Sequence, residues 1–412
     1  MTLSVLIAAG GAEWESAAVR TLESSPAVSD VRRCVDVLDL VATAAAGHAH
    51  AALVSIDLPG LDTDVVQRLV EARVTPVGYA EPDAIRVAQR FDAIGILTRT
   101  DVEGLAQIDD LVVAATALPD SLEELDPGEF ERHDRSSASG RLVTVWGPTG
   151  APGRSTVALG IAVESAAGGT PTLLIDADTY GGSLAQMLGM FDEVSGILST
   201  ARAADTGSLD LAVMTGHVRQ LSPTLRVLTG IGRADRWPQL RVGSFDRILQ
   251  VARTMAAAVV IDVGFCLETD EELTYDTSAP RRNAVTLRAL ERADSVVAVG
   301  SADPLGLARL TRGIHELRDK IADVDAHIVV NRMRDSLRWS RDDIAGSITR
   351  FTGREPMCFL PNDQATVDRA WVHGRTLAEV RDSPLRRELA SLTSRLLGVP
   401  EAPQRRRLAR RR

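Results

Sequence analysis

Apolar and polar segments alternate with the same rhythm in two stretches of the chain. Over residues 1–117, short apolar runs are separated by stretches whose apolar positions recur at helical spacing. The predicted strands are 4–8, 30–35, 51–56, 75–79 and 93–97, with helices such as 64–72 and 83–90 between them. This repetition predicts an α/β domain, a small parallel sheet covered by helices on both faces.

From 141 to 398 the rhythm resumes with longer elements. The continuous apolar runs 173–175, 225–228, 258–261, 295–299 and 327–330 are typical of buried parallel strands. They predict a larger α/β domain with a doubly wound, mostly parallel sheet, closed by a core-facing helix over 385–397. Residues 118–140 are acidic and then rich in serine and glycine, which predicts an interdomain linker.

Composition narrows the class of protein. The chain has 412 residues, 45% hydrophobic and 25% charged, which is typical of a globular protein with two or three domains. It has neither an apolar run long enough to span a membrane nor a basic, signal-like start, so we expect a cytoplasmic protein. Cys34, Cys266 and Cys358 lie far apart in apolar surroundings and are interpreted as core thiols.

Charge is distributed unevenly. The formal net charge of −10 disfavours specific DNA binding. Residues 399–412 are the exception, because they contain six arginines: Arg405, Arg406, Arg407, Arg410, Arg411 and Arg412. The segment is either a solvated disordered tail or a weak electrostatic contact to the membrane, to DNA or to an acidic partner.

The segment 146–156 carries the strongest chemical signal. It follows an apolar strand pattern, contains Gly150 and Gly153, and opens a helical pattern at Arg154, Ser155 and Thr156. Backbone N–H groups of such a turn and the helix N-terminus bind phosphate, and Ser155 stands where a hydroxyl holds Mg²⁺. The sequence therefore predicts binding of ATP or ADP with Mg²⁺.

Arg154 stands where this turn normally has a lysine that reaches the outer phosphates. Guanidinium grips phosphate through two N–H groups but is bulkier than ammonium, so we expect binding to survive and hydrolysis to weaken. A neutral alternative is drift in an arginine-rich chain, because Lys320 is the only lysine among 46 lysine and arginine residues.

Acidic residues end two further predicted strands. Asp176 and Asp178 follow the run 173–175, and Asp262 follows 258–261. Carboxyl ends of parallel strands are where ligands bind in such sheets. We expect Asp262 and Asp176 to assist Ser155 in holding Mg²⁺, and Asp178 to orient the attacking water. The alternative is helix capping or solvated strand ends.

The first stretch resembles a response-regulator receiver (CheY-like). Its segment 54–62 is similar to the phosphoacceptor loop, but the acceptor position is Ser55, Asp57 is two residues too late, and residues 8–11 lack the acidic pair. Without these carboxylates there is no site for Mg²⁺ and no nucleophile for phosphoryl transfer. We interpret residues 1–117 as a pseudo-receiver that serves docking or dimerisation.

Residues 141–398 resemble the MinD/ParA group of P-loop ATPases, through the 146–156 turn, the acidic strand ends, 329–332 and the closing segment 359–379. The resemblance implies that Asn331 and Pro361 contact the base and that the protein forms a homodimer. A pseudo-receiver in front of such a domain resembles the CpaE/TadZ branch, which implies partners in Flp-pilus secretion or at the division site. It also implies a position at the inner face of the membrane, at the pole or septum.

Two departures limit the predicted activity. The lysine that in this group crosses to the partner's nucleotide is Thr149 here, and Pro152 removes an N–H donor from the turn. The leading hypothesis is a nucleotide-binding positioning protein with weak or absent ATPase activity, in which Arg154 and Asp178 are the catalytic residues. The alternatives are a non-hydrolysing scaffold with a vestigial P-loop and a ParA-like DNA-segregating ATPase.

Overall fold

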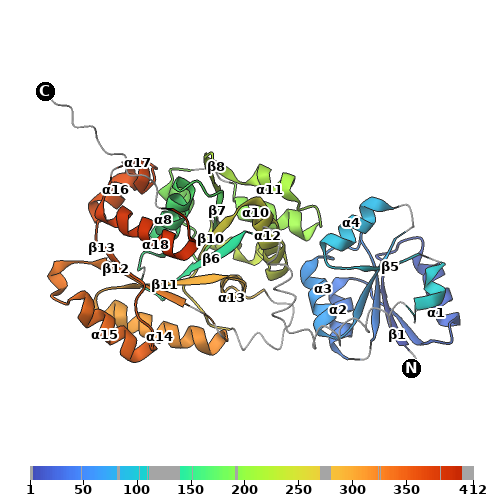
Figure 1. Cartoon of the computed structure of the whole chain (residues 1–412). Coiled ribbons are helices and arrows are strands. Elements are labelled where there is room, and N and C mark those ends of the chain that lie inside the picture. The colour runs from blue at the N-terminus through green and yellow to red at the C-terminus, as the bar shows by residue number, and fades with distance from the viewer. Residues whose placement is uncertain are drawn as a thin grey trace. The chain divides into compact units, whose positions relative to one another are not determined.

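The computed structural model describes residues 3–47, 49–80, 84–101, 103–108, 110, 140–150, 152–190, 194–269, 280–322, 324, 326–380 and 382–400. These residues group into two compact units, each with its own sheet (Figure 1). Nearly all of the expected linker, 118–140, and nearly all of the expected tail, 399–412, lie outside the described residues.

The described part of the first unit is a sheet of five parallel strands in the order β2-β1-β3-β4-β5. The strands are β1 (Leu3–Ala8), β2 (Val28–Arg33), β3 (Ala51–Ser55), β4 (Thr75–Tyr79) and β5 (Thr98–Thr100). The helices are α1 (Glu15–Ser24), α2 (Val37–Ala45), α3 (Thr63–Glu71), α4 (Ile85–Ala93) and η1 (Gly104–Gln107). This strand order is the doubly wound, flavodoxin-like one.

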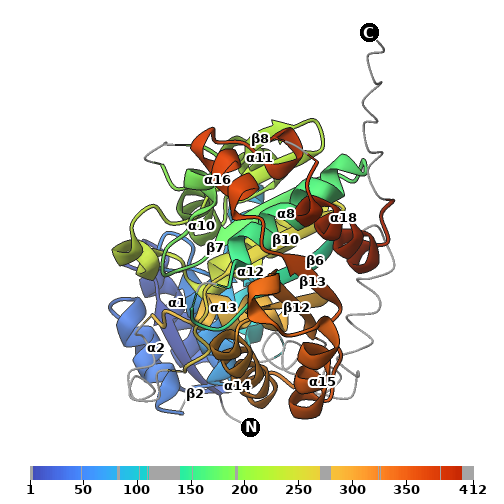
Figure 2. The same ribbon diagram turned by 90° about the vertical axis from the view of Figure 1, so that its left-hand side faces the viewer.

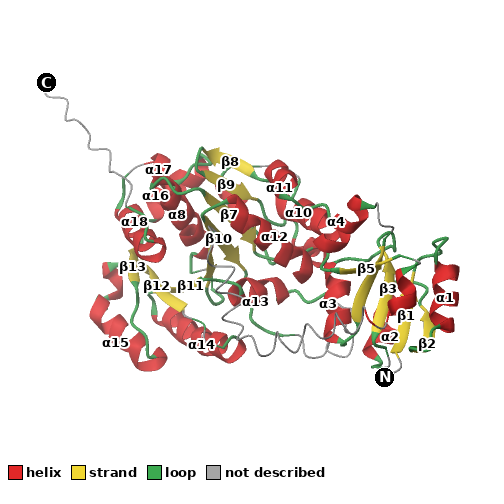
Figure 3. Cartoon of the chain, turned by 45° about the vertical axis from the view of Figure 1, so that its right-hand side comes forward, coloured by secondary structure: helices red, strands yellow, loops and turns green. Residues whose placement is uncertain are grey.

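Both faces of this sheet are covered, as the alternating pattern predicts. Leu22 of α1 packs with Leu105 of η1 in one apolar core, and Leu40 of α2 packs with Leu69 of α3 in the other. Figure 3 shows α1 on one side of the strands and α3 on the opposite side. Asp62 begins α3, because its carboxylate accepts a hydrogen bond from Val65 N at 2.9 Å.

Two boundaries in this unit differ from the sequence prediction. The strand predicted over 93–97 is wrong: α4 continues to Ala93, and the strand is β5. Ile94 and Ile96 are buried in the connection, where Gly95 has a φ of 91° that breaks the extended run. The apolar residues that predicted a strand are therefore buried in a turn. The second strand begins at Val28 and ends at Arg33, two residues before the predicted span.

The described strands of the second unit form an eight-stranded sheet in the order β13-β12-β11-β6-β10-β7-β9-β8. They are β6 (Arg141–Trp146), β7 (Thr172–Ala177), β8 (Arg219–Ser222), β9 (Leu225–Leu228), β10 (Ala258–Val263), β11 (Ser295–Ser301), β12 (Ala326–Met333) and β13 (Cys358–Pro361). Every pair is parallel except the edge pair β8–β9. The mostly parallel sheet is confirmed.

Helices pack over this sheet (Figure 2). They are α8 (Arg154–Ala167), α9 (Leu184–Met187), α10 (Gly196–Asp205), α11 (Leu211–His217), η2 (Ala234–Gln239), α12 (Val242–Met255), α13 (Ala284–Glu291), α14 (Pro304–Lys320), η4 (Asp335–Leu337), α15 (Arg341–Thr352), α16 (Gln364–Val372), α17 (Leu377–Val380) and α18 (Pro384–Leu397). The predicted final helix is confirmed as α18, whose Leu389 lies in the core against Gly160 of α8. Among the described residues, no helix is long and apolar enough to cross a membrane.

The cysteines are free thiols in different settings. Cys34 and Cys358 are buried, as expected of core thiols, and burial raises the pKa of the Cys358 thiol to about 11. Cys266 is only half-buried, and its sulfur accepts a hydrogen bond from Asn283 Nδ2 at 3.3 Å. The prediction of a core thiol is therefore wrong for Cys266, which lies after the end of the buried strand β10 (Ala258–Val263).

Candidate functional site

The predicted phosphate loop connects β6 to α8 at the carboxyl edge of the larger sheet. Gly150 and Gly153 have φ angles of 104° and 97°, a backbone conformation that side chains with a Cβ disfavour. Gly153 is the residue that precedes the first turn of α8. A Cβ at Gly153 would also clash with Asn331 Nδ2. Glycine is therefore required at Gly153 for two reasons, backbone angle and space.

Arg154 is folded back onto this loop. Its Nη1 donates to the carbonyl oxygens of Gly147 at 3.2 Å and Pro148 at 3.4 Å, and its Nη2 lies 3.6 Å from Asp178 Oδ2. Only 13% of the side chain is exposed, and its Nε has no hydrogen-bond partner among the described residues. A buried donor without a partner is costly, so an anion at this site would gain a ready contact.

Two carboxylates meet on neighbouring strands at the same edge. Asp262 of β10 pairs in register with Asp176 of β7, and both are 1% exposed. Neither oxygen of Asp262 has a hydrogen bond of normal geometry within the described chain, although the Ser155 side chain lies close enough to lower its pKa. Burial, and then the charge of Asp176, raise the pKa of Asp262 well above its usual range. Ser155 and Arg154 act on that pKa in the opposite direction.

This arrangement fits a magnesium ion. The Asp262 carboxylate is an oxygen donor of the kind that Mg²⁺ prefers, and Ser155 lies beside it in the first turn of α8. Mg²⁺ usually takes one or two protein oxygens and completes its shell with phosphate and water.

Asp176 and Asp178 organise the loop that follows β7. Asp176 accepts hydrogen bonds from Asp178 N at 3.3 Å and Leu184 N at 3.1 Å, and Asp178 accepts one from Tyr180 N at 2.8 Å. Burial is the main cause that raises the pKa of Asp176 to about 7. Asp176 is therefore a loop-shaping residue here, whereas the second oxygen of Asp178 points to Arg154.

Asn331 and Pro361, the residues predicted to contact the base, lie on the neighbouring strands β12 and β13. Asn331 donates from Nδ2 to Pro152 O at 2.7 Å and accepts at Oδ1 from Arg332 N at 2.8 Å, so its amide is used by the protein itself. Pro361 lies at the end of edge strand β13, paired with Met333.

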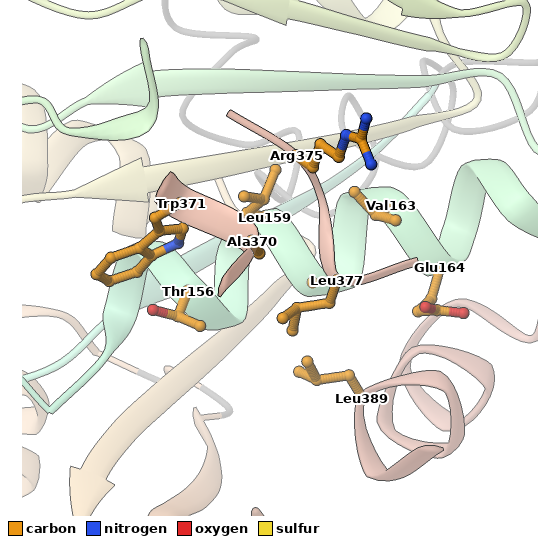
Figure 4. A pocket seen from close by; sticks show the side chains of 10 residues that line it. Thr156, Leu159, Val163, Glu164, Ala370, Trp371, Arg375, Leu377 and Leu389 are labelled. Carbon is orange, nitrogen blue, oxygen red and sulfur yellow. The ribbon is translucent and has the colours of Figure 1, made fainter. Parts of the chain in front are cut away.

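Thr156 lines a cavity of about 10 Å³ beside Leu159 and Trp371 (Figure 4). That cavity is too small for a nucleobase.

The sequence did not predict a pair of tilted aromatic rings next to the acidic edge. Tyr180 and Phe265 lie with ring centroids 4.8 Å apart. Arg282 lies 4.0 Å above the Tyr180 ring, and the Arg154 guanidinium lies 5.9 Å from the Phe265 ring centroid. Tyr180 OH also donates to Asn283 Oδ1 at 2.8 Å. No spacing rule predicts these contacts, because Arg154, Tyr180, Phe265 and Arg282 lie far apart in the sequence.

The receiver-like landmarks lie at the end of β3. Ser55 is buried, and its Oγ accepts a hydrogen bond from Asp57 N at 3.4 Å. The Asp57 side chain is 83% exposed and lies 3.3 Å from Arg90 Nη1. The turn after β1, residues 8–11, brings no carboxylate to this edge. Within the described residues, the chemistry of an acceptor aspartate is therefore not assembled here.

Comparisons with known proteins support the fold of the larger unit. No family model and no curated protein matches this chain. Among solved structures, a ParA family ATPase from Chlorobium tepidum TLS is 18% identical, covering 62% of this chain and 99% of its own, at a TM-score of 0.52. The cell division ATPase MinD from Pyrococcus furiosus is 15% identical, covering 63% of this chain and 100% of its own, at a TM-score of 0.50. The larger unit therefore has the fold of MinD/ParA-type P-loop ATPases.

Proposed function

We propose that this protein is a nucleotide-responsive positioning protein that binds ATP or ADP with Mg²⁺ in its larger unit. The observation that carries the proposal is the orphaned Asp262 carboxylate beside Ser155, at the end of a glycine turn that opens a helix. A buried carboxylate without a partner is stabilised by a cation, and the turn supplies N–H donors for phosphate. Together they fit a magnesium nucleotide.

Each protein group then has a defined task. The N–H groups of Gly153 and Arg154 would bind phosphate oxygens, while Ser155 and Asp262 would hold the ion. Bound Mg²⁺ supplies charge neutralisation for the phosphates. Arg154 leaves its loop carbonyls to meet phosphate, which frees Asp178 to orient water. Because Arg154 must exchange existing contacts for new ones, turnover is slow.

We further propose that the smaller unit recruits partners and that the chain acts as a homodimer. The support is the resemblance of the chain to the CpaE/TadZ branch and the missing acceptor chemistry at Ser55 and Asp57. The machinery positioned is then an Flp-type pilus or the division site, at the inner face of the membrane. A scaffold that never hydrolyses ATP is the second candidate, favoured by the contacts that hold Arg154 on Gly147 and Pro148.

Binding of fluorescent ATP and ADP with and without Mg²⁺, together with phosphate release, tests the proposal. We expect Mg²⁺-dependent binding that Arg154→Ala weakens at least tenfold, since it removes charge-assisted hydrogen bonds to phosphate. The control is Arg312→Ala, because Arg312 is exposed on α14. Wild-type protein that binds neither nucleotide would refute the proposal. Nucleotide binding without any phosphate release would favour the scaffold.

A further inference from the structure

A cavity of about 150 Å³ lies against the phosphate loop. One wall is the loop itself, Pro148, Thr149, Gly150 and Pro152. The end of β11 and the first turns of α14 also line it, together with Arg309 and Arg332. The cavity is polar, open and directly against the loop that we expect to hold phosphate.

Two arginines line this cavity with guanidinium groups that have no partner among the described residues. Within the described residues, no hydrogen bond or ion pair engages the guanidinium group of Arg309 or Arg332. Arg309 rests on the loop, because a Cβ at Gly150 would clash with its Nη1. Unpaired, half-buried guanidinium groups are binding sites for planar or tetrahedral anions.

One carboxylate, that of Asp303, lines the cavity with the two arginines and offsets only part of their charge. Asp303 caps α14 by accepting from Gly306 N at 2.9 Å, and it also accepts from Ser301 Oγ. The hydrogen bond from Ser301 is the main cause that lowers the pKa of Asp303. The cavity therefore keeps an excess of positive charge, and its helix terminus is already capped.

The backbone of Arg332 is strained, which supports a functional placement. Its φ is 61°, a left-handed conformation that is rare for residues with a side chain. Asn331 holds it there, because Asn331 Oδ1 accepts from Arg332 N while Asn331 Nδ2 binds the loop at Pro152 O. The loop and the Arg332 backbone are thus fixed by one side chain.

We infer that Arg309 and Arg332 bind the terminal phosphate of a nucleotide held by the loop of the same chain. The inference rests on the proposed function. It also identifies a source for the positive charge that Thr149, at the position of the group's lysine, does not supply. Arg309 lies against Gly150, the residue after Thr149. The pair would then distinguish a nucleoside triphosphate from a diphosphate, because only the triphosphate extends to them.

The test compares the affinities of full-length Arg309→Ala, Arg332→Ala and Arg309→Lys proteins for ATP and for ADP. We expect the alanine variants to bind ATP at least tenfold more weakly with ADP affinity changed less than threefold, and Arg309→Lys to retain part of the preference. Arg312→Ala, an exposed arginine on the same helix, is the matched control. Retained ADP binding shows that each variant is folded.

Each other outcome overturns a defined statement. Equal losses for ATP and ADP, or no loss, would refute the inference while the proposed function stands. Absence of nucleotide binding in wild-type protein would refute both. An effect that appears only at protein concentrations where the chain self-associates would assign the arginines to the nucleotide of a second copy, and would refute the same-chain statement.

Discussion

Replacing Asp176 with asparagine gives a pH-dependent change in stability whose sign follows from burial. In the folded chain Asp176 is 1% exposed, and its pKa is raised from 3.8 to about 7. The folded state therefore holds a proton that the unfolded chain releases between these two values. The contribution of Asp176 to the free energy of unfolding therefore falls as pH rises from about 4 to about 7, and is constant above pH 7.

The magnitude follows from the shift. One pKa unit is worth about 1.4 kcal/mol, so a shift of about three units penalises the folded wild type by about 4 kcal/mol at pH 8 and about 2 kcal/mol at pH 5. Asparagine carries no charge and loses one of the hydrogen bonds from Asp178 N and Leu184 N, which costs about 1 kcal/mol at every pH. The stability advantage of the variant over wild type should therefore increase by about 2 kcal/mol from pH 5 to pH 8.

Urea unfolding at pH 5 and pH 8 without nucleotide measures this gain. A Trp14→Phe background confines tryptophan fluorescence to the larger unit, and phenylalanine can keep the stacking of Trp14 on Tyr79 at 4.0 Å. The remaining four tryptophans are Trp146, Trp237, Trp339 and Trp371. A stability difference between variant and wild type that is the same at both pH values would refute the argument from burial.

Two further substitutions test the packing that shapes the site. Gly153→Ala should abolish nucleotide binding and should lower the free energy of unfolding more than Gly169→Ala does. Both glycines have a positive φ, which costs alanine about 1–2 kcal/mol. Only Gly153 also faces Asn331, so its substitution adds a clash. Equal costs in thermal unfolding would contradict the predicted clash. Leu389→Ala should destabilise the larger unit by about 3 kcal/mol, because it opens a cavity against Gly160. The 80% exposed Val372→Ala should change urea stability by less than about 0.5 kcal/mol, and similar losses in both variants would show that Leu389 is not a core contact.

The fold class was predictable from the sequence because it depends on local periodicity. Runs such as 258–261 are apolar throughout, which only strands buried on both faces require, and the structure places them in a mostly parallel sheet. The glycine turn before α8 was also predictable, since Gly150 and Gly153 adopt angles that other residues disfavour. The strand predicted at 93–97 failed because burial of Ile94 and Ile96 in a turn leaves the same local signal.

Tertiary structure alone decided which side chains meet. Asp262 and Asp176 are 86 residues apart in the chain, and only the β10–β7 register makes them neighbours with raised pKa values. Arg309 has the spacing of an ordinary solvated helix residue, yet the packing of α14 sets it on the phosphate loop. The sequence determined the phosphate loop and the carboxylates at strand ends. The contact between the two carboxylates and the placement of Arg309 and Arg332 depend on long-range strand order, which local patterns do not encode.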